Sequence, residues 1–200
     1  LSKKGHEIHF VTYSQPVRLE ALNAKLHFHE VNVPQYSLFK FQPYELALSS
    51  RLVDVVKDNN IDVLHVHYAI PHAYAAYMAK KMLEDEGIKI PIVTTLHGTD
   101  ITLVGSHPFY KSAVSFSINN SDCITAVSKS LKNDTIELFE IEKEIEVIHN
   151  FIDVEKFLIK KTPCERNLLA KEDEKIVVHI SNFRPLKRIM DGIYVFEQIS

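Results

Sequence analysis

The sequence of 200 residues is poor in cysteine, glycine and tryptophan: it has two cysteines, five glycines and no tryptophan. Cys123 and Cys164 are far apart and form no C-x-x-C pair. A disulfide framework or a zinc finger needs more cysteines at closer spacing, so we expect neither. We therefore expect reduced thiols and a cytoplasmic protein.

Long hydrophobic runs and a strong net charge are also missing. No apolar run reaches the roughly 18 to 20 residues that a membrane-spanning helix needs, and the opening "LSKKGHE" lacks the pattern of a signal peptide. The formal net charge of −3 gives no general attraction to nucleic acid or to anionic membranes. We expect neither a nucleic-acid partner nor stable membrane insertion.

The chain instead alternates β-rich runs with segments of helical periodicity. Strands are predicted at "EIHFVTY", "AKLHFHEVNV", 61–68, 90–96, 122–127 and "EIEVIHN", and helices at 43–60, 71–87, "HPFYKSAVSFSINNS" and after Ser128. The run at 90–96 is almost continuously apolar, which is typical of a parallel strand buried on both faces. This alternation predicts an α/β fold with a doubly wound, Rossmann-like parallel sheet.

A change of character near residue 151 predicts a second domain. Residues 151–175 are rich in charge and read as a linker, and the next segment predicts a strand at 176–181, a polar loop at 182–186 and a helix from about 187. We assign residues 1–160 to the first domain and 161–200 to the linker and the start of a second α/β domain. Because "LSKKGHEIHFVTY" reads as a helix end followed by a strand, we expect an earlier strand to precede the sequence.

Ligands of doubly wound sheets bind at the carboxyl ends of the strands, so the residues after each predicted strand are the candidates for a site. "HGTD" follows the strand at 90–96 directly. His97 can donate or accept a proton, Gly98 lets backbone N–H groups approach a ligand, and Asp100 could cap the next helix or orient a hydroxyl. The alternative is a tight left-handed turn with an aspartate cap.

Two further candidates follow from position alone. His65 and His67 share one face of a strand and could begin a metal site, but no third ligand has matching spacing nearby. Packed, hydrogen-bonded histidines are the better interpretation, and no metal is expected. Asn150 follows another strand, where its amide suits carboxylates or sugar hydroxyls, or forms a local Asx turn.

The segment "SNFRPLKR" brings Arg184, Lys187 and Arg188 to a predicted helix start. Cationic donors at a helix N-terminus suit a diphosphate, and the alternative is a solvated basic helix start. The sequence contains neither a Walker A motif nor G-x-G-x-x-G, which removes the main support for P-loop hydrolases and ordinary nicotinamide-dependent enzymes.

In this order, the motifs resemble those of the retaining GT-B-fold glycosyltransferases of family 4, above all the members that join N-acetylglucosamine to L-malate in bacillithiol biosynthesis. The likeness rests on "QPVRLE", "HVHYAIPHAYAAYMAK", "TTLHGTDITLVGSHPFYK", "AVSKSLK", "HNFID" and "SNFRPLKR". It implies two Rossmann-like domains that face a cleft, with L-malate bound by the first and UDP-N-acetylglucosamine (UDP-GlcNAc) by the second. It also implies transfer without a metal or other cofactor, and a possible homodimer.

On the acceptor side, the resemblance places Tyr68, Thr95 and Asn150 near the malate and His97 at the reacting centre. His149 stands where many relatives carry proline.

On the donor side, the resemblance places Gly98 beside the sugar, and Arg184 and Lys187 at the UDP diphosphate. The family's glycine-rich loop and its paired donor-binding glutamates are not found, so we expect the 200-residue chain to be inactive alone. Two alternatives stay open: a family 4 enzyme with another acceptor, and a non-catalytic α/β binding module.

Overall fold

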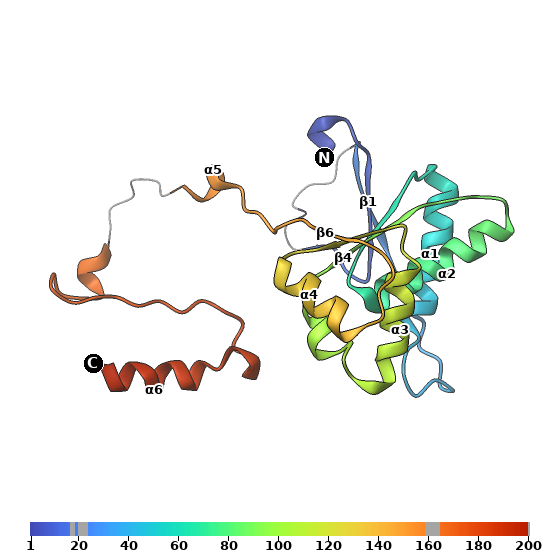
Figure 1. Ribbon diagram of the computed structural model, residues 1–200. Helices are drawn as coiled ribbons and strands as arrows, with labels where there is room; N and C mark the ends of the chain where they lie inside the picture. Colours follow the sequence, from blue (N-terminus) through green and yellow to red (C-terminus); the bar gives the residue numbers. More distant parts are fainter. Residues whose placement is uncertain (17–18, 20–23, 159–164, 200) are drawn as a thin grey trace. The chain divides into compact units, whose positions relative to one another are not determined.

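The computed structural model describes residues 1–16, 19, 24–158 and 165–199. The chain divides into two compact units, Leu1–Phe151 and Ile152–Ser200, which are described separately (Figure 1). The predicted domain boundary between residues 160 and 161, and Cys164, lie outside the described residues.

The first unit alternates strands and helices. In chain order these are β1 (Ile8–Thr12), β2 (Leu26–Glu30), α1 (Tyr44–Asn59), β3 (Leu64–His67), α2 (Tyr74–Asp85), β4 (Ile92–Leu96), α3 (Pro108–Asn119), β5 (Cys123–Ala126), α4 (Lys129–Leu138) and β6 (Ile145–Val147). Each strand and helix predicted for this part of the chain is present. The α/β class is therefore confirmed.

Local signals explain several of the element ends. Ser128 caps α4, because its hydroxyl oxygen accepts the N–H of Leu131 at 3.1 Å. Gly5 adopts a left-handed conformation, with φ of 98°, after a short 3₁₀ turn and before β1. Gly87, with φ of 81°, follows α2. Positive φ is inexpensive for glycine, so these two positions end helical turns as the sequence predicts.

All paired strands run parallel, but they form two sheets. β1 pairs with β2, and the second sheet has the order β3-β4-β5-β6. The sequence predicts one doubly wound sheet. The difference arises because, among the described residues, no strand hydrogen-bonds to both β1 and β3 and so none links the two sheets.

Helices cover one face of the four-stranded sheet. Ile92, Leu96, Ile124 and Ile145 are almost fully buried on this face, and α2, α3 and α4 lie on the same side (Figure 1). The opposite face of β4 carries Val93 and Thr95, which are only half-buried. The prediction that residues 90–96 are buried on both faces is therefore wrong for the second face, which is lined by polar side chains.

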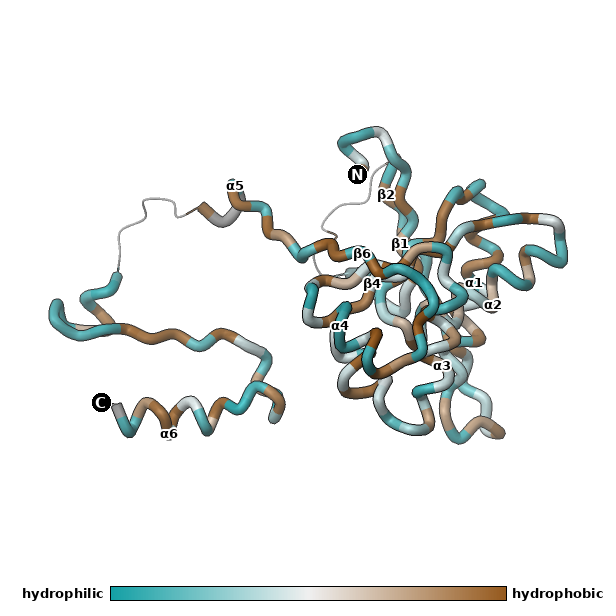
Figure 2. The backbone as a smooth tube through the Cα atoms, viewed as in Figure 1, coloured by the Kyte–Doolittle hydropathy of each residue, from teal (hydrophilic) through white to brown (hydrophobic). Residues whose placement is uncertain are grey.

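The second unit contains α5 (Val154–Phe157), 3₁₀ turns at Glu165–Leu168 and Pro185–Lys187, and α6 (Ile189–Ile199). The helix predicted from about residue 187 is confirmed. The strand predicted at 176–181 is wrong: these residues form no strand, and Ile180 is 91% exposed. No described segment of this unit offers a backbone partner, which a strand requires. Hydrophobic residues nevertheless recur along α6 and the segment before it (Figure 2).

None of the helices among the described residues has the length and apolar character needed to cross a membrane.

Candidate active site

Tyr68 and His97 meet at the carboxyl ends of β3 and β4. Each is the first residue after its strand, and the two strands are parallel neighbours. The backbone N–H of Tyr68 donates to the carbonyl of Thr95 at 2.9 Å. The rings of Tyr68 and His97 lie 5.0 Å apart between centroids. The structure thus brings together three residues that the sequence assigns to one site.

Three more histidines surround this pair, and we call His65, His67, His72 and His97 the edge group. His67 Nδ1 lies 2.8 Å from His97 Nε2, so one ring donates a hydrogen bond to the other. The rings of His65 and His67 stack at 4.9 Å. His72 Nδ1 donates to the carbonyl oxygen of His67 at 2.7 Å. The ring of His97 is therefore held by its neighbours rather than free to rotate.

Thr95 connects the edge group to β5. Its hydroxyl lies 2.9 Å from His65 Nε2 and 2.8 Å from the hydroxyl of Thr125. Because Thr95 pairs with Thr125 across the sheet, this polar ladder lies on the face that the helices leave uncovered. The predicted acceptor residue Thr95 is thus half-buried within the sheet, not at its tip.

Burial keeps imidazoles of the edge group neutral. Removal from water, and to a smaller extent the neighbouring imidazoles of His65, His97 and His72, together lower the pKa of His67 to about 4. Burial is also the largest cause that lowers the pKa of His65 and of His72. A neutral imidazole has one donor and one acceptor, which suits hydroxyl ligands.

Asp100 organises the loops on which the site is built. It is 3% exposed, and its Oδ1 accepts the N–H groups of His97 at 3.2 Å and Gly98 at 2.9 Å. Its Oδ2 accepts the N–H of Ala69, in the loop after β3, at 3.0 Å. Asp100 lies in the first turn of a short helical turn, Thr99–Leu103, that follows Gly98. Its carboxylate accepts backbone N–H groups at the start of this turn, which agrees with the predicted turn and aspartate cap, and it also holds the loop after β3. No pattern in the sequence indicates the bond from Ala69 to Asp100.

Unusual backbone conformations occur on both sides of His97. Gly98 has a φ of 114°, and a Cβ built there would meet no atom within 4 Å. The backbone, not packing, therefore requires glycine, and space beside His97 stays open. Tyr68 has a φ of 78°, a conformation that costs a non-glycine residue roughly 1–3 kcal/mol and is common at functional sites.

Asn150 lies farther from this centre. It is exposed, three residues beyond the end of β6. β6 is two strand positions from β4, which corresponds to about 10 Å. Next to it, His149 Nδ1 donates to the carbonyl of Val127 at 3.2 Å. Asn150 shares the edge of the sheet with His97 but is not its immediate neighbour.

Arg184 and Lys187 belong to the second unit. Both side chains are exposed. The backbone N–H of Lys187 donates to the carbonyl of Arg184 at 2.8 Å in the 3₁₀ turn before α6. Arg188, by contrast, forms an ion pair with Asp191 in the first turn of α6. Of the three predicted cations, Arg184 and Lys187 are therefore better suited to an anionic ligand.

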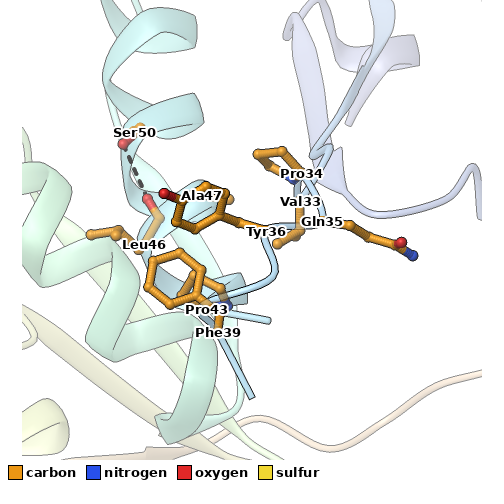
Figure 3. Close-up of a pocket in the computed structure, with 9 residues that line it drawn as sticks. All are labelled: Val33, Pro34, Gln35, Tyr36, Phe39, Pro43, Leu46, Ala47 and Ser50. Carbon is orange, nitrogen blue, oxygen red and sulfur yellow. Dashed lines mark hydrogen bonds between the residues drawn. The ribbon is translucent and has the colours of Figure 1, made fainter. Parts of the chain in front are cut away.

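An apolar pocket lies apart from the predicted residues. Its volume is about 410 Å³, and Figure 3 shows side chains of the loop before α1 and of the first turns of α1 around it. It is lined by Val33, Pro34, Gln35, Tyr36, Phe39, Pro43, Leu46, Ala47 and Ser50. The aromatic residues of "PQYSLFKFQP" were a signal for it that the sequence reasoning missed. Without a charged lining residue, it suits neither a dicarboxylate nor a diphosphate.

Among the described residues, one group of three has the spacing of metal ligands: Glu7, His9 and His27, directly before β1 and on β1 and β2 rather than in the edge group. The imidazoles of the edge group are hydrogen-bonding groups for a polar ligand rather than members of this metal-ligand set.

Known proteins resemble the chain over most or all of its length. Residues 1–156 match Glycosyltransferase Family 4. The chain is 49% identical over 201 aligned residues to the N-acetyl-alpha-D-glucosaminyl L-malate synthase of Bacillus anthracis, which covers 100% of this chain and 52% of the relative. It is 28% identical over 152 residues to an uncharacterized glycosyltransferase of Methanocaldococcus jannaschii, covering 76% of this chain and 40% of that protein.

The chain thus spans about half the length, or less, of the curated relatives it matches. The match to the family extends from the first strand to the helix after β6, so it includes the whole edge of the sheet that carries Tyr68 and His97. The chain belongs to Glycosyltransferase Family 4.

Proposed function

We propose that the full-length protein containing this chain transfers N-acetylglucosamine from UDP-GlcNAc to the hydroxyl of L-malate, the reaction that begins bacillithiol biosynthesis. The observation that carries the proposal is the 49% identity, over the whole chain, to a protein named for this product. The grouping of Tyr68, Thr95 and His97 at one edge of a parallel sheet supports it, because ligands of such sheets bind there.

In this proposal, the first unit holds malate. Malate has two carboxylates and one hydroxyl, and it needs hydrogen-bond donors. The phenol of Tyr68, which is 38% exposed, supplies a donor at the reacting centre. We also assign the amide of Asn150 to malate, which requires the segment after β6 to bring it toward Tyr68 when the acceptor binds. The neutral imidazoles of His65 and His67 add hydrogen-bonding groups to the malate site without adding a charge. Thr95 positions His65 through its hydroxyl and can itself reach a ligand on the uncovered face.

The transfer step balances without a protein nucleophile. The bond between the anomeric carbon and the UDP oxygen breaks as the malate oxygen bonds to that carbon. The hydroxyl proton leaves with the departing diphosphate. If attack and departure share one face of the sugar, the configuration is retained. His97 lies where this centre would form, and the open space at Gly98 admits the sugar.

Charge on the leaving diphosphate must be stabilised, and cations placed in advance do this most effectively. Arg184 and Lys187, one 3₁₀ turn apart, are the residues that we assign to it. With two protein cations in this role, the reaction needs no metal ion. A cytoplasmic location and a homodimer complete the proposal.

The test is release of UDP by purified full-length protein supplied with UDP-GlcNAc and L-malate. We expect release that depends on malate, and no release from the 200-residue chain alone, because relatives are about twice as long. Release only with another hydroxyl acceptor would replace malate, and no release with any acceptor would favour a binding module. NMR of the product anomeric proton decides retention.

A further inference from the structure

A second cluster of metal-ligating side chains lies on the two-stranded sheet, and we call Glu7, His9, His27 and His29 the strand-pair group. His9 pairs with His27 in the parallel register of β1 and β2, and Val11 pairs with His29. Paired residues and residues two apart share a face, so the three imidazoles lie on one side of the sheet. Their rings stack, with His9 at 4.4 Å from His27 and 5.1 Å from His29.

Three of these side chains converge on one point. Glu7 Oε1 lies 3.2 Å from His9 Nε2 and 2.9 Å from His27 Nε2. The three ligand atoms all lie within 4.8 Å of one another. Two ligands of a tetrahedral Zn²⁺ ion with bonds of about 2.0–2.1 Å are separated by about 3.3 Å. The spacing of the carboxylate oxygen from both nitrogens is close to that value.

Hydrogen bonds within the chain leave one of these nitrogens unexplained. His27 Nε2 is buried and has no hydrogen-bond partner in the part of the chain that the structure describes, although Glu7 Oε1 is only 2.9 Å away. The oxygen therefore approaches off the N–H axis, as happens when two ligands point toward an ion between them. A buried polar atom without a partner costs about 1–3 kcal/mol, and a bound cation removes that cost.

The fourth member supplies the outer support that metal-binding histidines need. His9 Nδ1 lies 2.8 Å from His29 Nε2, and the His9 side chain is only 5% exposed. When His9 donates from Nδ1 to His29, its Nε2 lone pair faces the convergence point. Ligating histidines commonly donate their other ring N–H in this way, which fixes the tautomer and the ring orientation.

We propose that Glu7, His9 and His27 bind a divalent transition-metal ion of the Zn²⁺ class, with His29 orienting His9. Two imidazoles and one carboxylate match the ligand preference of Zn²⁺. The ion joins the start of β1 to β2 and stabilises this two-stranded sheet. The site departs from the sequence expectation of no metal. It has no part in the proposed sugar transfer, because the strand-pair group includes none of the residues assigned to malate, to the sugar or to the diphosphate.

The competing interpretation is a chain of hydrogen bonds without an ion. In it, His29 donates to His9 Nδ1, and His9 donates from Nε2 to Glu7. That arrangement satisfies His9 and Glu7, but it leaves His27 Nε2 without a partner. Metal binding accounts for all four side chains at once.

The experiment titrates the metal-stripped chain with Co²⁺, followed by competition with Zn²⁺. We expect visible d–d absorption of a low-symmetry four-coordinate site that saturates at one ion per chain and is displaced by Zn²⁺. Glu7→Gln and His27→Gln are each expected to weaken binding about tenfold or more, because each removes a ligand. Both side chains are partly exposed, so these variants should fold, which circular dichroism checks.

His6→Gln is the matched control: it removes an exposed histidine next to Glu7 that is outside the group, and we expect unchanged affinity. Absence of the Co²⁺ spectrum overturns the proposal in favour of the hydrogen-bonded chain. Binding that survives both Glu7→Gln and His27→Gln also overturns it, because the ion then sits elsewhere.

Discussion

The edge group and the strand-pair group are both clusters of imidazoles on neighbouring parallel strands, yet their partners differ. In the strand-pair group a carboxylate, Glu7, faces two ring nitrogens. In the edge group the hydrogen bonds run to hydroxyls, to a backbone carbonyl and between rings. A carboxylate among imidazoles favours a cation, whereas hydroxyls and burial favour neutral rings that bind polar ligands. The same residue type thus serves two chemistries according to its neighbours.

The largest expected effect comes from replacing one histidine of each group by alanine and comparing the transfer rates of the two variants. His97→Ala in the full-length protein should lower kcat/KM for malate-dependent UDP release at least about 100-fold, because a positioned group at the reacting centre is lost. His27→Ala should leave this rate unchanged while weakening Co²⁺ binding. His107→Asn, which keeps the cap of α3, is the control. Similar losses of rate in His97→Ala and His27→Ala would show that the two groups are not separate.

Removal of Asp100 should loosen the edge group without touching the strand-pair group. Asp100→Ala leaves the N–H of Ala69, which is buried, and those of His97 and Gly98, which are partly buried, without their acceptor, so we expect a loss of about 2–3 kcal/mol in the free energy of unfolding. Urea denaturation measures it, and the Co²⁺ spectrum should persist. A loss below about 0.5 kcal/mol, the usual range for surface changes, would mean that water replaces the carboxylate.

Two glycines in the same loop should respond differently. A Cβ at Gly105 would lie 2.1 Å from the carbonyl oxygen of Asp100, whereas one at Gly98 meets nothing within 4 Å. Gly105→Ala should therefore cost about 2 kcal/mol through overpacking, and Gly98→Ala about 1 kcal/mol through its positive φ. In the transfer assay the order should reverse, since only Gly98 faces the proposed sugar. Equal effects on both measurements would contradict the distinction.

The smallest expected effect is the response of the edge group to acid. The pKa of His67 is about 4 in the folded chain and about 6.5 when unfolded. The unfolded chain therefore binds more protons between these values, and stability falls as the pH drops from about 6.5 to about 4. Solvent near His67 limits its share to about 1 kcal/mol. His67→Asn should reduce the slope of the free energy of unfolding against pH between about 4 and 6.5, as measured by urea denaturation at several pH values. An unchanged slope would show that groups other than His67 cause the pH dependence.

The sequence predicted the first unit well because its elements carry local signals. Hydrophobic periodicity located α1 and β4, and Ser128 marked the start of α4. The convergence of Tyr68 and His97 also followed, since parallel strands end at a common edge. These predictions needed only the local hydrophobic and capping patterns, together with the rule that parallel strands end at the same edge of a sheet.

Features that depend on distant partners were not predicted. The segment 176–181 has the composition of a strand but has no strand partner among the described residues of its unit. The bond from Asp100 to Ala69 joins two loops whose separation the sequence does not encode. The strand-pair group depends on the register of β1 with β2, and a shift by one residue would send His27 to the other face.

The carboxylate of Asp100 has a consequence for how the edge can move. Because one side chain holds the loop after β3 and the loop after β4, neither loop can shift alone without breaking a buried hydrogen bond. The residues assigned to the acceptor and the residue assigned to the reacting centre therefore move together or stay still together. An acceptor that displaces Tyr68 would, through this link, also displace His97. The position of the bound acceptor would therefore affect the geometry at the anomeric carbon of the donor sugar.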